Sequence, residues 1–282
     1  MIIIDGKKLA VEIKSRVAFD VTQIIHDGGQ IRFDAVLVGD DASSQIYVNS
    51  KKRECEKLGI SFELHYLPAT VTQDDLENLI TRLSSNEKIN GILLQLPLPK
   101  GFDAKSAIAK IDPVKDVDGL TTINFGRLAK EENPQLIPCT ALGILYAIHS
   151  VCPDVTGKNI TVIGRSSIVG KPTALLLMQH NATVTICHKQ TRDLAKHTRN
   201  ADIVVTATGV AGLLTADMVS PKAIIIDVGI NRLPDGRIVG DCDFDNVSQK
   251  VYAITPVPKG IGPLTIAFLL HNIVTAYNLQ QK

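Results

Sequence analysis

The chain is poor in the residues that mark secreted and metal-binding proteins. Its 282 residues include no tryptophan and only five cysteines, at positions 55, 139, 152, 187 and 242. The cysteines are odd in number and widely separated, which argues against a disulfide framework and against a zinc site. We therefore expect no bound metal and a reducing cytoplasm.

Neither charge is in excess, and no long apolar run is present. The chain has 30 Lys and Arg against 29 Asp and Glu, a formal net charge of +1, which argues against a nucleic-acid partner or an anionic membrane surface. No stretch approaches the roughly 18 apolar residues of a membrane span. The first residues lack a basic leader and a cleavage site, so the mature protein is expected to start at Met1.

Strands and helices alternate along the chain, which predicts parallel sheets with helical crossovers. The expected strands are 33–39, 61–66, 90–96, 159–163, 183–187, 202–206, 223–227 and 251–254, with a hairpin near 233–237. The expected helices are 43–58, 73–84, 103–111, 141–150, 172–179, 191–199 and 264–279. We predict a two-domain α/β fold with a cleft between the domains. An N-terminal substrate domain would span 1–140 plus 264–282, and a Rossmann-like dinucleotide domain 141–263.

Two chemically useful side chains share one face of the helix expected at 43–58. Tyr47 and Lys51 are four residues apart, or one turn, near the end of the sheet where α/β proteins bind ligands. Gln95 is the polar exception near the C-terminal end of an apolar strand and must find a hydrogen-bond partner, which we expect at the same sheet edge. Taken singly, Lys51 is typical of a solvated helix lysine and Tyr47 of a rim aromatic.

The segment 115–119 carries two carboxylates, Asp116 and Asp118, just before Gly119. Either could bind a ligand at the sheet edge. The alternative is that both only cap the turn that Gly119 ends.

A glycine-containing loop, residues 164–172, joins the strand at 159–163 to the next helix. Gly164 would permit a sharp turn and Gly170 close packing, and free N–H groups at the helix start would favour a pyrophosphate. Pro172 is expected at the first helical position. The pattern Gly-x-Ser-x-x-x-Gly departs from the usual dinucleotide motif, so a ligand-free glycine turn is the alternative.

The strand at 183–187 is followed by His188 and Lys189 instead of the acidic residue that usually holds the ribose of NAD. Arg165 and Lys189 would attract a 2′-phosphate, which makes NADP the expected cofactor. Surface solvation of both charges is the alternative.

Five motifs in one order resemble the bifunctional methylenetetrahydrofolate dehydrogenase/cyclohydrolase family: residues 47–51, 95–99, 115–119, 164–166 and 256–258. The resemblance covers nearly the whole length. It implies a homodimeric, cytoplasmic enzyme of one-carbon metabolism whose partners are tetrahydrofolate derivatives. Such an enzyme oxidises 5,10-methylenetetrahydrofolate with NADP and hydrolyses the methenyl product to 10-formyltetrahydrofolate in one shared cleft.

The resemblance also implies roles, position by position. On the folate side, the matching residues are Lys51 as the essential lysine, Gln95 as its partner, Tyr47 as the stacking ring, Asp118 as the pterin carboxylate, and Pro258 and Gly262 as further substrate contacts. On the cofactor side they are Gly164, Arg165, Ser166 and Lys189, with Ile230 as a backbone contact near the nicotinamide.

The chemistry of the hydrolysis fits a lysine paired with a glutamine. Water that attacks the methenyl carbon loses a proton, so Lys51 would need a pKa lowered toward neutrality. Burial and a neutral partner such as Gln95 lower the pKa of an amine, whereas a carboxylate partner raises it.

Two positions depart from the family pattern. Ala141 stands where a proline is usual, which should loosen a helix start slightly. Lys259 stands where a glycine is usual. It costs about 1 kcal/mol if the position needs a positive φ; otherwise its charge would reach the glutamate tail of the folate.

Three other functions stay open. A dehydrogenase with weak or no cyclohydrolase activity is disfavoured because Lys51 and Gln95 are both present. A shikimate-like or amino-acid dehydrogenase explains neither Gln95 nor the turn at 256–263. A nucleotide-sensing module without catalysis does not explain Lys51, Gln95 and Asp118 at one sheet edge.

Overall fold

The structure is a computed structural model that describes residues 1–281, and it forms two compact units. The six-stranded unit comprises Met1–Glu12, Leu128–Glu131 and Pro138–Phe268. The three-stranded unit comprises Ile13–Arg127, Glu132–Ile137 and the chain from Leu269 onward. Both units are α/β with a parallel main sheet, which confirms the predicted fold class.

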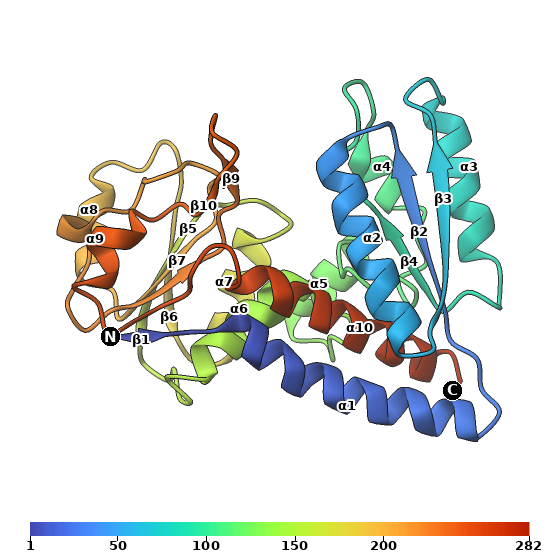
Figure 1. Cartoon of the computed structure of the whole chain (residues 1–282), viewed down its shortest axis with the longest axis horizontal. Helices are drawn as coiled ribbons and strands as arrows, with labels where there is room; N and C mark the ends of the chain where they lie inside the picture. The colour runs from blue at the N-terminus through green and yellow to red at the C-terminus, as the bar shows by residue number, and fades with distance from the viewer. Residues whose placement is uncertain (282) are drawn as a thin grey trace. The chain divides into compact units, whose positions relative to one another are not determined.

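In the three-stranded unit, helices cover both faces of a parallel sheet of order β3-β2-β4 (Figure 1). Its strands are β2 (Arg32–Val38), β3 (Ser61–Leu67) and β4 (Gly91–Leu94). Its helices are α2 (Ala42–Lys57), α3 (Gln73–Ser84) and α4 (Ala104–Ile108). Leu76 and Ile80 of α3 pack with Val36 and Leu94 in one core, and α2 lies on the other face. The carboxyl ends of the strands therefore meet at one edge, where α2 begins.

The six-stranded unit has the strand order β1-β11-β8-β7-β5-β6, with all neighbours parallel. Its strands are β1 (Ile2–Ile3), β5 (Asn159–Ile163), β6 (Thr183–Cys187), β7 (Ile203–Thr206), β8 (Ile224–Asp227) and β11 (Ala253–Ile254). The chain runs from β5 to β6 on one side and then to β7 on the other side of β5. In such sheets the strand-order switch opens a crevice at the carboxyl ends of the two strands, here β5 and β7.

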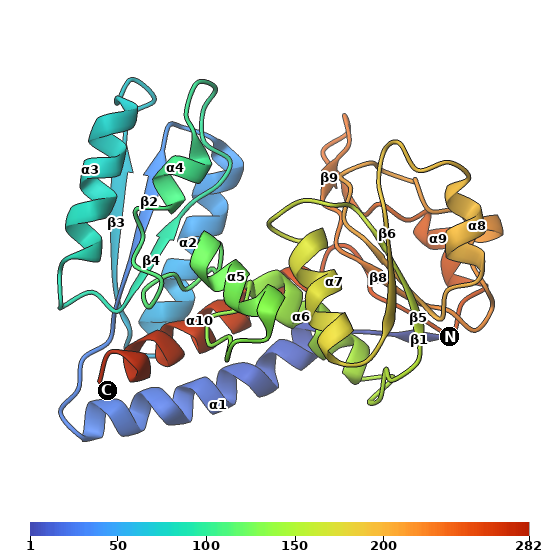
Figure 2. The same ribbon diagram turned by 180° about the vertical axis from the view of Figure 1, so that it is seen from behind.

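Helices again cover both faces of this sheet. Those of one face, seen in Figure 2, are α6 (Cys139–His149) and α7 (Gly170–Gln179). Those packed in the opposite core are α8 (Leu194–Arg199), the 3₁₀ helix η1 (Ala216–Met218) and α9 (Phe244–Ser248). The predicted hairpin is confirmed as β9 (Asn231–Arg232) antiparallel to β10 (Ile238–Val239).

Three helices contribute residues to both units: α1 (Gly6–His26), α5 (Thr122–Lys130) and α10 (Ile261–Leu279). We did not predict α1 or α5. In α1 the buried residues Ala10, Ile13, Val17 and Val21 recur every three or four positions, which is the helical period. None of the helices in residues 1–281 has the length and apolar character needed to cross a membrane.

Several predicted boundaries were wrong in ways that affect the site. Helix α7 begins at Gly170, so Pro172 is its third residue and not its first. Strand β4 ends at Leu94, which leaves Gln95 just beyond the ladder. The helix predicted at 103–111 is shortened to α4, and α8 begins only at Leu194, because Asp193 caps it through the backbone N–H of Lys196.

Candidate functional site

Lys51 and Gln95 meet at the carboxyl-terminal ends of the strands in the three-stranded unit. The Lys51 Nζ donates a hydrogen bond of 2.9 Å to Gln95 Oε1. Gln95 is 8% exposed, its Nε2 donates to the Leu96 carbonyl at 2.7 Å, and its backbone N–H donates to Val36 at 2.9 Å. Because the amide nitrogen is held by a carbonyl, the amide oxygen is fixed toward the amine. The expected partner of Gln95 is thus confirmed to exist, and it is Lys51.

Helix α2 positions this lysine and presents Tyr47 one turn before it. The Asp41 carboxylate caps the helix by accepting from the Ser44 backbone N–H at 2.7 Å, a bond that lowers the pKa of Asp41. Tyr47 is 38% exposed, whereas the next residue, Val48, is buried. An aromatic ring on the surface beside an amine can stack on a flat ligand while the amine reaches the same ligand.

The segment 115–119 divides into structural residues and a candidate ligand-binding residue. The buried Asp116 accepts hydrogen bonds from the backbone N–H groups of Leu120 (3.1 Å) and Thr121 (2.7 Å) and from Asn124 Nδ2 (2.9 Å). Capping is therefore the observed role of Asp116. Asp118 is half-buried, two residues beyond the bridge that pairs Asp116 with Ile92 of β4.

Lys115 is also structural. Its Nζ donates to the carbonyls of Ser84 (2.7 Å) and Asn86 (2.8 Å), and burial lowers the pKa of this amine. Together Lys115 and Asp116 fix the backbone that carries Asp118.

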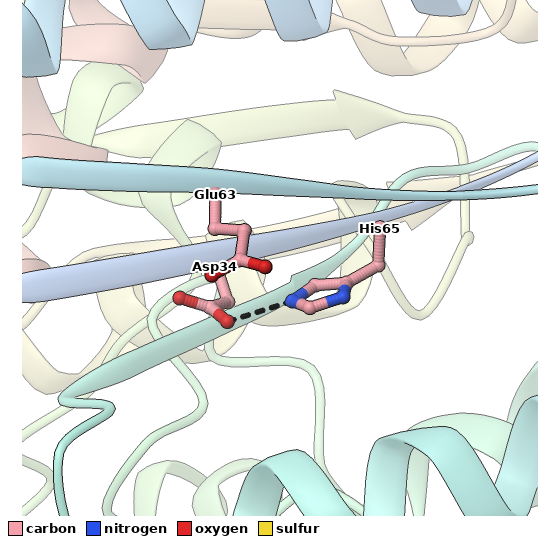
Figure 3. Close-up of side chains that lie close together, drawn as sticks. All are labelled: Asp34, Glu63 and His65. Atoms are coloured by element: carbon pink, nitrogen blue, oxygen red, sulfur yellow. Dashed lines mark hydrogen bonds and ion pairs between the residues drawn. The ribbon is translucent and has the colours of Figure 1, made fainter.

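A separate polar cluster on the same sheet brings Asp34, Glu63 and His65 together (Figure 3). The buried Asp34 accepts from Arg32 Nε (2.7 Å) and Nη2 (2.8 Å) and lies 2.7 Å from His65 Nε2, and Arg32 also pairs with Glu63. The hydrogen bond with Asp34 raises the pKa of Arg32. One guanidinium ion pairs with both carboxylates, which accounts for their proximity. In the sheet register Asp34 pairs with Ile92, three residues before Gln95, and successive side chains of a strand point to opposite faces. The cluster therefore lies on the face of the sheet opposite to Gln95 and its partner Lys51.

A cavity of about 760 Å³ opens in the six-stranded unit at the strand-order switch between β5 and β7. Its lining includes Gly164, Arg165, Ser166 and Lys189, so the structure brings together four of the predicted cofactor residues. The volume is typical of a cofactor or ligand pocket.

Gly164 turns the chain into this cavity. Its φ is 124°, and a Cβ there would lie 2.4 Å from the Ala207 carbonyl oxygen, so no other residue fits. A Cβ at Gly170 would lie 2.0 Å from the Gly164 carbonyl oxygen, which agrees with the close packing we expected there.

The start of α7 corrects one expectation. The backbone N–H groups of Val169 and Gly170 donate to Ser166 Oγ at 3.1 and 3.4 Å, and that of Lys171 donates to the Ser166 carbonyl at 3.0 Å. These N–H groups are therefore not free to hold a pyrophosphate in this conformation. Ser166 thus occupies the N–H groups at the start of α7, and the basic side chains at the rim of the cavity are the candidate anion-binding groups.

Arg165 and Lys189 are exposed residues at this rim. Arg165 Nη2 lies 3.4 Å from Gln190 Oε1, a weak hydrogen bond that a phosphate could displace. Thr191 fixes the loop that carries Lys189, since the backbone N–H of His188 donates to Thr191 Oγ1 at 2.8 Å.

The remaining predicted residues lie outside the cavity lining. Ile230 is 53% exposed and directly precedes β9. Pro258 is exposed, and Gly262 is the second residue of α10. Lys259 has a φ of 85°, so the positive φ of the first of the two alternatives is the observed one.

Thr208 and Val210 also line the cavity, and sequence reasoning missed them. They follow the end of β7 in a loop whose Gly209 has a φ of 70°. A glycine just beyond a buried parallel strand was the available signal.

Family models for a catalytic domain and for an NAD(P)-binding domain match the chain. Residues 4–118 match the family model described as tetrahydrofolate dehydrogenase/cyclohydrolase, catalytic domain, and residues 138–281 match its NAD(P)-binding domain. The "Bifunctional protein FolD" of a Sulfurihydrogenibium species is 48% identical over 279 residues, covering 98% of each chain.

Two solved structures have nearly the same fold. The bifunctional FolD methylenetetrahydrofolate dehydrogenase/cyclohydrolase from Campylobacter jejuni has a TM-score of 0.96 at 42% identity and covers 99% of each chain. The Trypanosoma brucei methylenetetrahydrofolate dehydrogenase-cyclohydrolase, complexed with NADP and an inhibitor, has a TM-score of 0.95 at 35% identity. The match covers 100% of the present chain and 99% of that protein.

Proposed function

The chain belongs to the tetrahydrofolate dehydrogenase/cyclohydrolase family, and from this premise we infer both of its reactions. It oxidises 5,10-methylenetetrahydrofolate to the methenyl form with NADP, and it hydrolyses that product to 10-formyltetrahydrofolate. The observation in the molecule that best supports the second step is the Lys51–Gln95 hydrogen bond, since the attacking water must lose a proton and hydride transfer needs no proton acceptor.

The cavity beside Gly164 is the proposed NADP site. NADP, when bound, accepts the hydride that leaves the methylene carbon. We assign the 2′-phosphate to Arg165 and Lys189, because both are basic, exposed and at the rim of the cavity. Ser166 holds the adjoining backbone in place through its bonds to the start of α7. The backbone of Ile230 is assigned to the nicotinamide end.

The folate is assigned to the edge that carries Tyr47, Lys51 and Gln95. Tyr47 stacks on the pterin ring, because its ring is exposed one turn from Lys51. Asp118 accepts hydrogen bonds from the pterin, on a backbone that Lys115 and Asp116 hold rigid. Pro258 and Gly262 are proposed as further substrate contacts. Hydride transfer needs accurate ring positioning and no acid, which is the service these groups provide.

Lys51 is the proposed base of the hydrolysis. A water oxygen forms a bond to the methenyl carbon, and a proton of that water passes to the Lys51 amine. When the carbon–N5 bond breaks, the hydroxyl oxygen left on the carbon loses its remaining proton and becomes the formyl oxygen, while N5 gains one proton. Of the two protons of the water, one therefore ends on N5 and one is released. Gln95 accepts a hydrogen bond from Lys51 without adding charge, which keeps a neutral amine accessible.

We also propose a homodimer in a reducing, cytoplasmic setting. None of the five cysteines forms a disulfide, which supports the compartment. The exposed apolar side chains Ile46, Leu64 and Tyr66 on α2 and β3 offer surface for a second copy. Light scattering behind a sizing column is expected to give about 61 kDa, twice the 30.5 kDa of one chain, and a mass of one chain would contradict the dimer.

A steady-state assay of both reactions in one preparation, with NADP and NAD side by side, tests the function. We expect oxidation of methylenetetrahydrofolate with a preference for NADP, and hydrolysis of methenyltetrahydrofolate. Oxidation without hydrolysis would instead support the monofunctional alternative.

A further inference from the structure

Asp241 is a fully buried carboxylate in the six-stranded unit, and the proposed reactions give it no role. It follows β10 and precedes α9. Its side chain accepts hydrogen bonds from Thr206 Oγ1 (3.0 Å), Thr208 N (2.6 Å), Thr208 Oγ1 (2.9 Å), Gly209 N (3.3 Å), Val210 N (3.0 Å) and Asn231 Nδ2 (3.0 Å). Most of these donors belong to one loop, the segment just beyond β7.

That loop forms part of the wall of the proposed cofactor cavity. Thr208 and Val210 both line the cavity and both donate to Asp241. Asn231, a donor from outside this loop, adjoins Ile230, the residue assigned to the nicotinamide end. One carboxylate therefore sets the position of two segments on the cofactor side of the unit.

The carboxylate is itself held from behind. Asp227, the last residue of β8, accepts the Asp241 backbone N–H at 2.9 Å and that of Cys242 at 2.9 Å. Burial raises the pKa of Asp227. Gly229 lies so close to Asp241 that a Cβ at this position would be 2.1 Å from Asp241 Oδ1. The close approach of the segment between β8 and β9 to Asp241 therefore requires glycine.

An ionised carboxylate is the group best suited to this position. One oxygen, Oδ2, receives four of the donors, and a carboxylate oxygen accepts hydrogen bonds without donating any. An asparagine can turn only its oxygen toward one set of donors, and its NH₂ group then faces other donors. These N–H and O–H groups stabilise the buried carboxylate, so their positions and the carboxylate depend on one another.

We propose that Asp241 is a positioning residue for NADP: it fixes the loop of Thr208 and Val210 in the conformation that the bound cofactor requires. The inference rests on the proposed NADP site and adds a residue that does not touch the cofactor. It predicts a specific loss of NADP affinity, because the loop can no longer hold one conformation.

The test compares Asp241→Asn with Asp245→Asn, which makes the same charge change at an exposed position nearby. Isothermal titration calorimetry is expected to show the NADP dissociation constant raised by about tenfold to a hundredfold in Asp241→Asn and unchanged in Asp245→Asn. Hydrolysis of methenyltetrahydrofolate, measured without NADP, should stay within about twofold of the native rate in both variants.

Thr208→Val is a milder second variant that decides the matter if Asp241→Asn fails to fold. It keeps the buried carboxylate and removes Thr208 Oγ1, which donates to Asp241 at 2.9 Å and accepts from the Val210 backbone N–H at 3.3 Å. About a fivefold to tenfold weaker NADP binding is expected. Unchanged NADP affinity in a folded variant, or an equal loss of hydrolysis and NADP binding, would overturn the proposal. A native chain that binds NADP but oxidises no folate would contradict the proposed function instead, and the titrations would still decide the role of Asp241.

Discussion

Replacing Gln95 with glutamate exchanges an amide nitrogen for an oxygen of similar size and places a negative charge beside Lys51. In the native chain the two side chains are 2.9 Å apart, and Gln95 is 8% exposed, so little water screens the new charge. A carboxylate this close favours the ammonium form of an amine and moves its titration upward by about 1–3 pH units. Each unit of this upward shift reduces the fraction of neutral amine at neutral pH about tenfold.

The proposed base must be neutral to accept a proton, so hydrolysis by Gln95→Glu is expected to fall by about 10-fold to 1000-fold at neutral pH. The rate should recover as the pH rises. The variant also loses the hydrogen bond from Nε2 to the Leu96 carbonyl, which costs about 1–3 kcal/mol of folding free energy. Hydride transfer needs no base, so the dehydrogenase reaction should fall far less.

The assay is the initial rate of disappearance of methenyltetrahydrofolate absorbance across a pH series, after subtraction of the uncatalysed rate. Gln45→Glu is the matched control, because it adds the same charge to an exposed position of α2. A Gln95→Glu enzyme with the native rate and the native pH midpoint would refute the reasoning about a neutral partner.

Two further substitutions test other parts of the account. Arg165→Ala is expected to raise the Michaelis constant for NADP by about tenfold or more and that for NAD much less, because a charged contact to the 2′-phosphate is lost; equal effects on both cofactors would remove the assignment. Lys259→Gly is expected to raise the free energy of unfolding by up to about 1 kcal/mol in urea denaturation, since the φ of 85° suits glycine. Lys222→Gly, at an exposed position without a positive φ, should not stabilise, and a stabilisation there would show that the gain is not specific to backbone strain.

The alternation of strands and helices was sufficient to predict the α/β class, because buried parallel strands are short apolar runs between amphipathic helices. The helix predicted at 73–84 matches α3 from end to end, since Thr72 caps its start through the backbone N–H of Asp75. Helix α1 was missed because exposed apolar residues, Val11, Phe19 and Ile25, blur its buried stripe. Boundaries near proline and glycine were the least predictable, as Pro172 inside the first turn of α7 shows.

At the site, the sequence identified polar side chains in apolar surroundings, which must form a hydrogen bond with another residue. Gln95 was such a residue, and its partner in the structure is Lys51 of α2. Sequence could not separate Asp116 from Asp118, because capping depends on which N–H groups the folded turn presents. It also gave no sign of Asp241, whose hydrogen-bond donors lie mostly about 30 residues earlier in the chain.

The most direct test of the central claim is the rate of methenyltetrahydrofolate hydrolysis by Lys51→Met, measured together with its NADP dissociation constant. Lys51 belongs to the three-stranded unit and the cavity proposed for NADP to the six-stranded unit, so the substitution is expected to remove the proposed base without altering the proposed cofactor site. The account predicts almost complete loss of hydrolysis with native NADP affinity. Hydrolysis at the native rate would contradict it.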